Sequence, residues 1–138
     1  MSGDVPSLWV AVSWCLEDEA GEATDALLEL ARDERAVVPS LWYLELGNVL
    51  LQAERCGRVS AADTTTSRAP IKDLPIVMDD ETSLRALRET LTLARAEQLS
   101  SYDAAYLELA MRRGLPLATK DRSLRAAAER IGIHPIPE

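Results

Sequence analysis

Short apolar runs alternate along the chain with longer segments in which apolar residues recur at helical spacing. The apolar runs predict strands at residues 36–38, 75–78, 115–118 and 133–136. The periodic segments predict helices at residues 24–32, 40–55, 60–70, 81–97, 100–113 and 121–130. The run at residues 7–15 is apolar on nearly every side and fits either a helix capped by Ser7 or a buried strand. Strands that alternate with helices predict an α/β fold whose parallel sheet is covered on both faces.

Several helix boundaries are marked by capping and stop residues. Ser40 and Ser100 stand where helix N-caps are expected, and Gly114 follows the helix that it ends. We expect Pro70 to end the helix that begins at residue 60. Segment 81–97 has apolar residues at i, i+3, i+7 and i+10, namely Leu84, Leu87, Leu91 and Ala94. This spacing predicts one continuous helix over that segment.

The length and composition predict one domain over residues 1–138. The chain has a mass of 15.1 kDa with 47% hydrophobic and 28% charged residues, which excludes disordered, collagen-like and disulfide-scaffold classes. Cys15 and Cys56 have no Cys or His neighbours at ligand spacing, which argues against a zinc site and favours a cytoplasmic location. No apolar run approaches the roughly 20 residues of a membrane-spanning helix, so we expect no membrane partner.

The net charge of −8 argues against a protein that binds nucleic acid through its overall field. The charge is uneven, because residues 1–80 carry 6 basic and 15 acidic side chains whereas residues 81–138 carry 9 and 8. An anionic ligand is therefore expected to favour the C-terminal half or a bound metal ion. The candidate contacts to an RNA backbone are Arg112, Arg113, Lys120, Arg122 and Arg125.

Three carboxylates stand in apolar helical or strand-end contexts, where a buried charge is costly unless something compensates it. Glu45 shares a polar stripe with Asn48 on its helix, Asp103 lies among apolar neighbours near a helix start, and Asp121 follows a strand. Each has a structural alternative: an exposed face for Glu45, a first-turn acid for Asp103 and an N-cap for Asp121.

The candidate chemistry depends on convergence of these three acids at one rim of the sheet, where open α/β folds bind their ligands. Carboxylates about 5 Å apart would repel by about 3 kcal/mol per pair at an effective dielectric of about 20. A divalent cation would remove that repulsion. Oxygen ligands without His or Cys point to Mg²⁺ or Mn²⁺, which suit phosphoryl chemistry.

Three motifs, in this order along the chain, resemble those of PIN-domain ribonucleases of the VapC toxin type. They are LELGN at residues 44–48, YDAAYLELA at 102–110 and GLPLATKD at 114–121. The resemblance covers most of the chain and implies a PIN-like α/β/α sandwich with a short central parallel sheet. It also implies four acids around one or two Mg²⁺ or Mn²⁺ ions. The second, third and fourth of these acids fall on Glu45, Asp103 and Asp121, and Asn48 and Thr119 match accompanying polar positions.

The resemblance further implies what the protein does and what it binds. The expected activity is that of an Mg²⁺- or Mn²⁺-dependent endoribonuclease, the toxin of a toxin–antitoxin pair, which hydrolyses RNA phosphodiesters. Structured RNA such as tRNA is the expected substrate. A cognate VapB-type antitoxin is expected to block the site, and the protein is expected to form a homodimer.

The chain departs from the family pattern at the first acid. Alignment of residues 10–19 with the family's first helix places Ser7 where the family has Asp, and Asp4 is three residues out of register. No apolar strand precedes Ser7, which predicts a lead strand that is altered or missing. The alternative function is therefore a catalytically impaired PIN-like protein that binds an antitoxin or another partner without cleaving RNA.

Overall fold

The computed structural model describes residues 8–11, 35–73, 76–119 and 121–136. The elements in chain order are β1 (Leu8–Ala11), β2 (Arg35–Pro39), α2 (Leu41–Arg55), α3 (Ala61–Lys72), β3 (Ile76–Asp79), α4 (Thr82–Arg85), α5 (Glu89–Glu97), α6 (Ser101–Arg113), β4 (Leu117–Ala118), α7 (Arg122–Arg130) and β5 (Pro135–Ile136).

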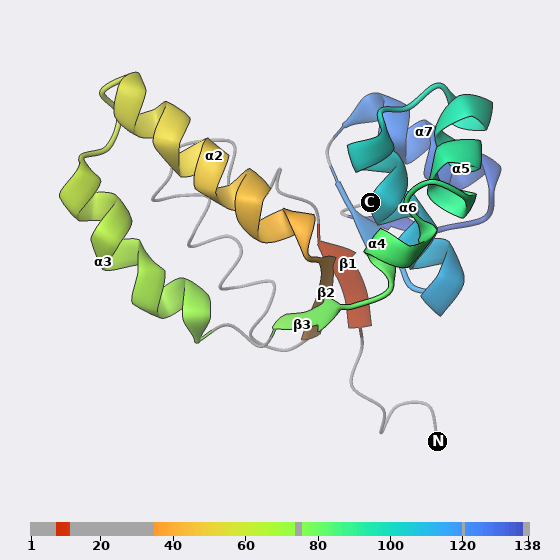
Figure 1. The fold of residues 1–138 in the computed structure, drawn as a ribbon, viewed down its shortest axis with the longest axis horizontal. Helices are drawn as coiled ribbons and strands as arrows, with labels where there is room; N and C mark the ends of the chain where they lie inside the picture. The colour runs from red at the N-terminus through yellow and green to blue at the C-terminus, as the bar shows by residue number, and fades with distance from the viewer. Residues whose placement is uncertain (1–7, 12–34, 74–75, 120, 137–138) are drawn as a thin grey trace.

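The strands form one five-stranded sheet in the order β3-β2-β1-β4-β5, and every pairing in it is parallel. In Figure 1, α2 and α3 lie on one side of the strands and α4 to α7 lie on the other. This arrangement confirms the predicted α/β fold with a short central parallel sheet. Because all strands run the same way, the segments that follow them leave from one edge of the sheet.

The core is centred on α6, which packs against β1, β2 and β4 and against its neighbours α5 and α7. Seven consecutive residues of this helix, 104–110, are buried. Consecutive buried residues cover every side of a helix, so α6 belongs to the core, and the charge of its buried Glu108 is compensated by Arg112. Within the described ranges, no helix is both long enough and apolar enough to cross a membrane.

A lead strand is present, which corrects the expectation that it is missing, but it lies after Ser7 and not before it. The alignment of residues 10–19 with the family's first helix is also corrected, because Val10 and Ala11 lie in this strand. Leu8–Ala11 form β1, the strand alternative for residues 7–15, and β1 pairs with β2 on one side and β4 on the other. Val10 is completely buried there. The sequence of a central parallel strand is apolar throughout and shows no alternation, so periodicity alone does not separate it from a buried helix. Ser7, Asp4 and the predicted helix at 24–32 lie outside the described residues.

The prediction of one continuous helix over residues 81–97 is wrong. The segment forms α4 and α5, separated by a turn whose last residue, Arg88, has the non-helical angles φ −123° and ψ −96°. Leu84 and Leu87 are 75% and 83% exposed, so the apolar stripe does not share one buried face. The turn directs α5 onto α6. A smaller correction concerns α3, which continues past Pro70 to Lys72.

Candidate functional site

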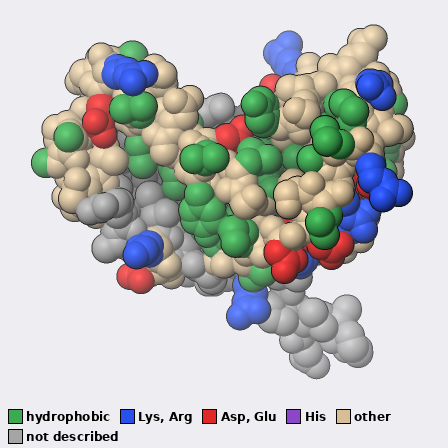
Figure 2. Space-filling view, viewed as in Figure 1, with side chains coloured by type: hydrophobic (Ala, Val, Ile, Leu, Met, Phe, Trp, Pro, Cys, Tyr) green, Lys and Arg blue, Asp and Glu red, His purple; other side chains and the backbone are tan. Residues whose placement is uncertain are grey.

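The three predicted acids lie on elements that follow different strands. Glu45 is in the second turn of α2, which begins directly after β2. Asp103 is in the first turn of α6, and Asp121 immediately precedes α7 after β4. In the space-filling view, the molecule is notched between the side that carries α2 and α3 and the side that carries α5 to α7 (Figure 2).

Asp121 is fixed by a tight local hydrogen-bond pattern. Its Oδ1 accepts from the backbone N–H of Leu124 at 3.0 Å, and its own N–H donates to Thr119 Oγ1 at 3.1 Å. Arg125 also holds this turn by donating to the carbonyl of Thr119 at 2.7 Å. Asp121 is therefore the N-cap that the sequence offered as its structural alternative. Thr119, which is 1% exposed, anchors the turn at the end of β4.

Asp103 is held at the start of α6 through its backbone, which leaves its carboxylate out of the capping. Its N–H donates to Ser100 Oγ at 3.1 Å, so the hydroxyl of Ser100 caps the helix. Burial raises the pKa of the Asp103 carboxyl, and the nearby charge of Asp121 raises it further. The third and fourth predicted acids are thus close enough to repel each other.

Glu45 reaches the same region through a residue that the sequence analysis did not single out. The phenol of Tyr106 on α6 donates a hydrogen bond to Glu45 Oε1 on α2. Burial raises the pKa of Tyr106, and both the hydrogen bond to Glu45 and the charges of Glu45 and Asp103 raise it further. Tyr106 is therefore a permanent donor that faces two of the predicted acids. The signal in the sequence was a tyrosine inside a buried helix, since a buried Tyr hydroxyl usually has a partner.

The donor set at this rim fits a hard divalent cation. It consists of carboxylates, with the Thr119 hydroxyl next to Asp121. The charges of Asp103 and Asp121 repel each other in partly buried surroundings, and oxygen ligands of this kind suit Mg²⁺ or Mn²⁺. The three predicted acids do not form a group whose ligand oxygens all lie within 4.8 Å of one another, judged on the described residues. Mg²⁺ is commonly held by one or two carboxylates and keeps several waters, so contact with all three is not required.

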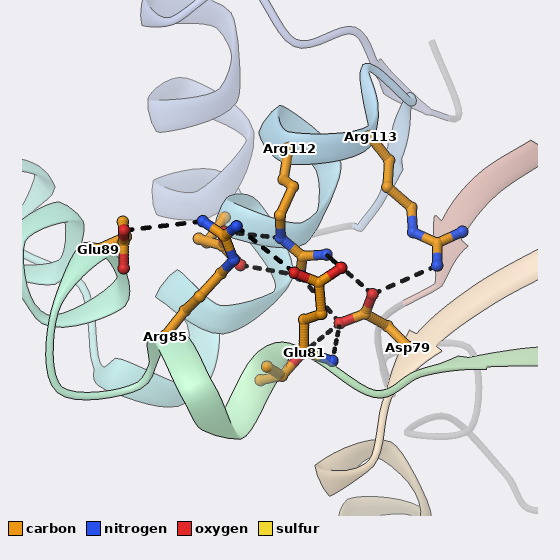
Figure 3. A network of polar contacts seen from close by, with 8 residues as sticks. Asp79, Glu81, Arg85, Glu89, Arg112 and Arg113 are labelled. Carbon is orange, nitrogen blue, oxygen red and sulfur yellow. Dashed lines mark hydrogen bonds and ion pairs between the residues drawn. The ribbon is translucent and has the colours of Figure 1, made fainter.

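Among the described acids, a group whose carboxylate oxygens do lie within 4.8 Å of one another is found at the end of β3 and consists of Asp79, Asp80 and Glu81. Two arginines already pair with the buried acid of this cluster, as Figure 3 shows. Arg112 donates to both carboxylate oxygens of Asp79 at 2.9 Å, and Arg113 donates to Oδ1 at 3.3 Å. The pKa of Asp79 is lowered well below its ordinary value, chiefly by the Arg112 hydrogen bonds. We interpret the cluster as an ion-pair network that joins β3 to α6.

The network involves two of the arginines that the sequence analysis named as candidate contacts to an RNA backbone. Arg112 and Arg113, two of the candidate backbone contacts, pair with Asp79. Lys120 lies outside the described residues. Arg122 and Arg125, both on α7 beside Asp121, are the candidates that stay near the predicted acids.

Comparison with known proteins identifies the family of this chain. Residues 7–130 match the PIN domain. Exonuclease VapC9 of Pyrobaculum aerophilum is 33% identical to this chain over 93 residues, which are 67% of each protein. The crystal structure of PAE2754 from Pyrobaculum aerophilum matches with a TM-score of 0.66 and 25% identity, and the match covers 95% of this chain and 91% of that one. The chain therefore belongs to the PIN-domain family of nucleases and, within that family, to the VapC type.

Proposed function

We propose that this protein is an Mg²⁺- or Mn²⁺-dependent ribonuclease that hydrolyses RNA phosphodiesters as the toxin of a toxin–antitoxin pair. The observation that carries the proposal is the hydrogen bond from Tyr106 to Glu45, which joins α2 to the face of α6 that bears Asp103. A partly buried carboxylate such as that of Asp103, on which the charge of a second carboxylate acts, is suited to a divalent ion.

Each acid has a role in this proposal. Asp103 and Asp121 would hold the ion, and Glu45 on α2 would supply a third negative charge beside it. A bound Mg²⁺ or Mn²⁺ would polarise the scissile phosphate and lower the pKa of the attacking water. Arg122 and Arg125 on α7 provide positive charge for the RNA backbone on the side of Asp121. Because the acids repel phosphate in the absence of a cation, the ion has to bind before the RNA.

The proposed partners follow from the family. A VapB-type antitoxin would cover the acids and neutralise the toxin, and two copies of the chain would form a homodimer. Structured RNA such as tRNA is the proposed substrate. Co-purification with the antitoxin encoded beside this protein, and the molar mass from light scattering, test the two protein partners separately.

The experiment that tests the activity is cleavage of a structured RNA in millimolar Mn²⁺ by the parent protein and by Asp103→Asn. The expected result is cleavage by the parent and a loss of at least about 100-fold in the variant, as for removal of a metal-activating group. Asp80→Asn is the matched control, since Asp80 is an exposed acid of the β3 cluster and its loss should leave cleavage unchanged. Equal losses in both variants would contradict the assignment of Asp103.

A circular RNA separates the two modes of hydrolysis. The relative from Pyrobaculum aerophilum is named an exonuclease, whereas we propose endonucleolytic cleavage here. An endonuclease opens the circle, because it needs no free end, and an exonuclease leaves it intact. Cleavage of linear RNA together with an intact circle would replace the proposed mode by exonucleolytic hydrolysis.

The alternative is a catalytically impaired protein that binds an antitoxin without cleaving RNA. The sequence observation that raised it is the alignment that places Ser7 at the family's first acid, with Asp4 as the nearest carboxylate. In the structure Val10 and Ala11 of that aligned segment belong to β1, and residues 12–16, which follow this strand in the sequence, contain no acid either. Thermal unfolding with and without Mn²⁺ distinguishes the two proposals, because an ion that binds only the native state raises the midpoint. A midpoint that Mn²⁺ leaves unchanged, in a protein that still binds its antitoxin, favours the alternative.

A further inference from the structure

Tyr106 and Glu45 form a polar contact between two helices that come from distant parts of the chain. The residues are 61 positions apart, and the phenol donates to Glu45 Oε1 across the gap from α6 to α2. Tyr106 is 1% exposed, so packing fixes its ring, whereas Glu45 is a longer and partly exposed side chain. A fixed donor of this kind restricts the rotation of a flexible carboxylate.

The position of Tyr106 on α6 relates its hydrogen bond with Glu45 to Asp103. Tyr106 follows Asp103 by three residues, so both side chains lie on one face of the helix. The hydroxyl therefore connects Glu45 on α2 to the face of α6 that carries Asp103.

We propose that Tyr106 is a positioning residue, whose hydroxyl orients the Glu45 carboxylate toward a divalent cation held at Asp103 and Asp121. This inference rests on the proposed function, because it needs the metal centre of that proposal. Tyr106 itself does not touch the ion or the RNA. Its effect reaches the site through Glu45 alone.

The test is calorimetric titration of the metal-free, full-length protein with Mn²⁺, comparing Tyr106→Phe with the parent. The substitution keeps the ring and its packing and removes the hydroxyl. We expect the affinity for Mn²⁺ to fall by about tenfold, the lower end of the effect of residues that orient metal ligands. Tyr102→Phe is the matched control, because Tyr102 lies on the same helix and is 63% exposed. It should bind Mn²⁺ as the parent does.

A second comparison separates positioning from a general structural role. If the hydroxyl acts through Glu45, Tyr106→Phe should change the Mn²⁺ affinity by less than about twofold when Glu45 is already alanine. A tenfold loss that persists in the Glu45→Ala protein overturns the proposal. So does a Tyr106→Phe protein that is unfolded without metal, because the hydroxyl would then be needed for folding itself.

The failure of this inference is distinguishable from that of the proposed function. A parent that binds Mn²⁺ and a Tyr106→Phe variant that binds it equally well overturn the positioning role alone. A parent that gives no Mn²⁺ binding overturns the metal centre and, with it, the positioning role.

Discussion

Replacing Arg112 by methionine removes the central cation of the network between β3 and α6. Arg112 donates to both oxygens of Asp79, whose side chain is completely buried, and to both oxygens of Glu108, whose side chain is 7% exposed. Methionine has a similar length and no donor, so the two carboxylates would lose their main partner. Glu108 keeps its ion pair with Arg85 at 3.7 Å.

The expected cost follows from what Asp79 retains. Breaking a buried ion pair from one side typically destabilises a protein by about 3–5 kcal/mol. Asp79 still accepts from Thr82 Oγ1 at 3.0 Å and from the N–H of Glu81 at 3.2 Å, and Arg113 remains nearby. We therefore expect the lower end, about 3 kcal/mol. At a urea dependence of about 2 kcal/mol per molar, this lowers the unfolding midpoint by about 1.5 M.

The control is the same substitution at an exposed ion pair. Arg130 donates to Glu97 Oε1 at 2.6 and 2.9 Å, but its side chain is 57% exposed. Arg130→Met should therefore cost no more than about 1 kcal/mol. Adding Asp79→Asn to Arg112→Met removes the unpaired charge and should recover part of the loss. Equal midpoints for Arg112→Met and Arg130→Met would refute the reasoning that burial sets the strength of the network.

Three further predictions use the local geometry of the described residues. Ser100→Ala should lower the stability by about 1 kcal/mol because it removes the α6 cap, whereas Ser40→Ala should be nearly neutral because Ser40 makes no side-chain capping bond; urea unfolding of the pair measures the difference. Gly114→Ala should lower the stability by about 1 kcal/mol because Gly114 has a φ of +65°. Gly47→Ala, within α2, should raise the stability by a similar amount, so the urea unfolding midpoints of the two variants should shift in opposite directions. The lowered pKa of Asp79 contributes stability that is complete above about pH 5 and is lost progressively as the pH falls from the ordinary Asp value of about 3.9 toward the lowered pKa. Asp79→Asn should therefore make the melting temperature less dependent on pH between about pH 5 and 2.

The helices that a local signal marks were predictable from the sequence. Ser100 caps α6, Asp121 caps α7, and Gly114 ends α6 in the left-handed conformation, as their residue types indicate. Each of these signals depends on a few neighbouring residues. The strands β4 and β5 are shorter than their apolar runs, since two residues of each are paired. Pairing depends on the neighbouring strand, which a single run does not contain.

The errors in the sequence analysis arise where tertiary contacts decide the structure. The spacing of Leu84 and Leu87 predicted a buried stripe, yet both are exposed and the helix breaks. β1 was ambiguous because a central strand is apolar throughout. The pairing of Asp79 with Arg112 spans 33 residues, and neither residue lies in a motif that links it to the other.

The candidate site shows the same division between local and distant information. The family motifs led to Glu45, Asp103 and Asp121 as a set, and the structure couples the last two through their charges. Tyr106 lies inside one of those motifs, three residues after Asp103, and nothing in the motif itself indicates a partner for its hydroxyl. Its hydroxyl becomes informative only when α2 brings Glu45 to it.

The two ends of α6 take part in different groups of contacts. Its first two turns carry Asp103 and Tyr106, whereas its last two carry Glu108 and Arg112 in the network that reaches β3. Like charges at the first end oppose folding unless a cation is bound, and the ion pairs at the other end stabilise the same buried helix. If this division is correct, Arg112→Met should lower the stability of the metal-free protein while leaving the increase produced by saturating Mn²⁺ nearly unchanged, because the two ends lie about 14 Å apart along the helix at 1.5 Å per residue. An increase that disappears with Arg112 would show instead that the network itself holds the site together.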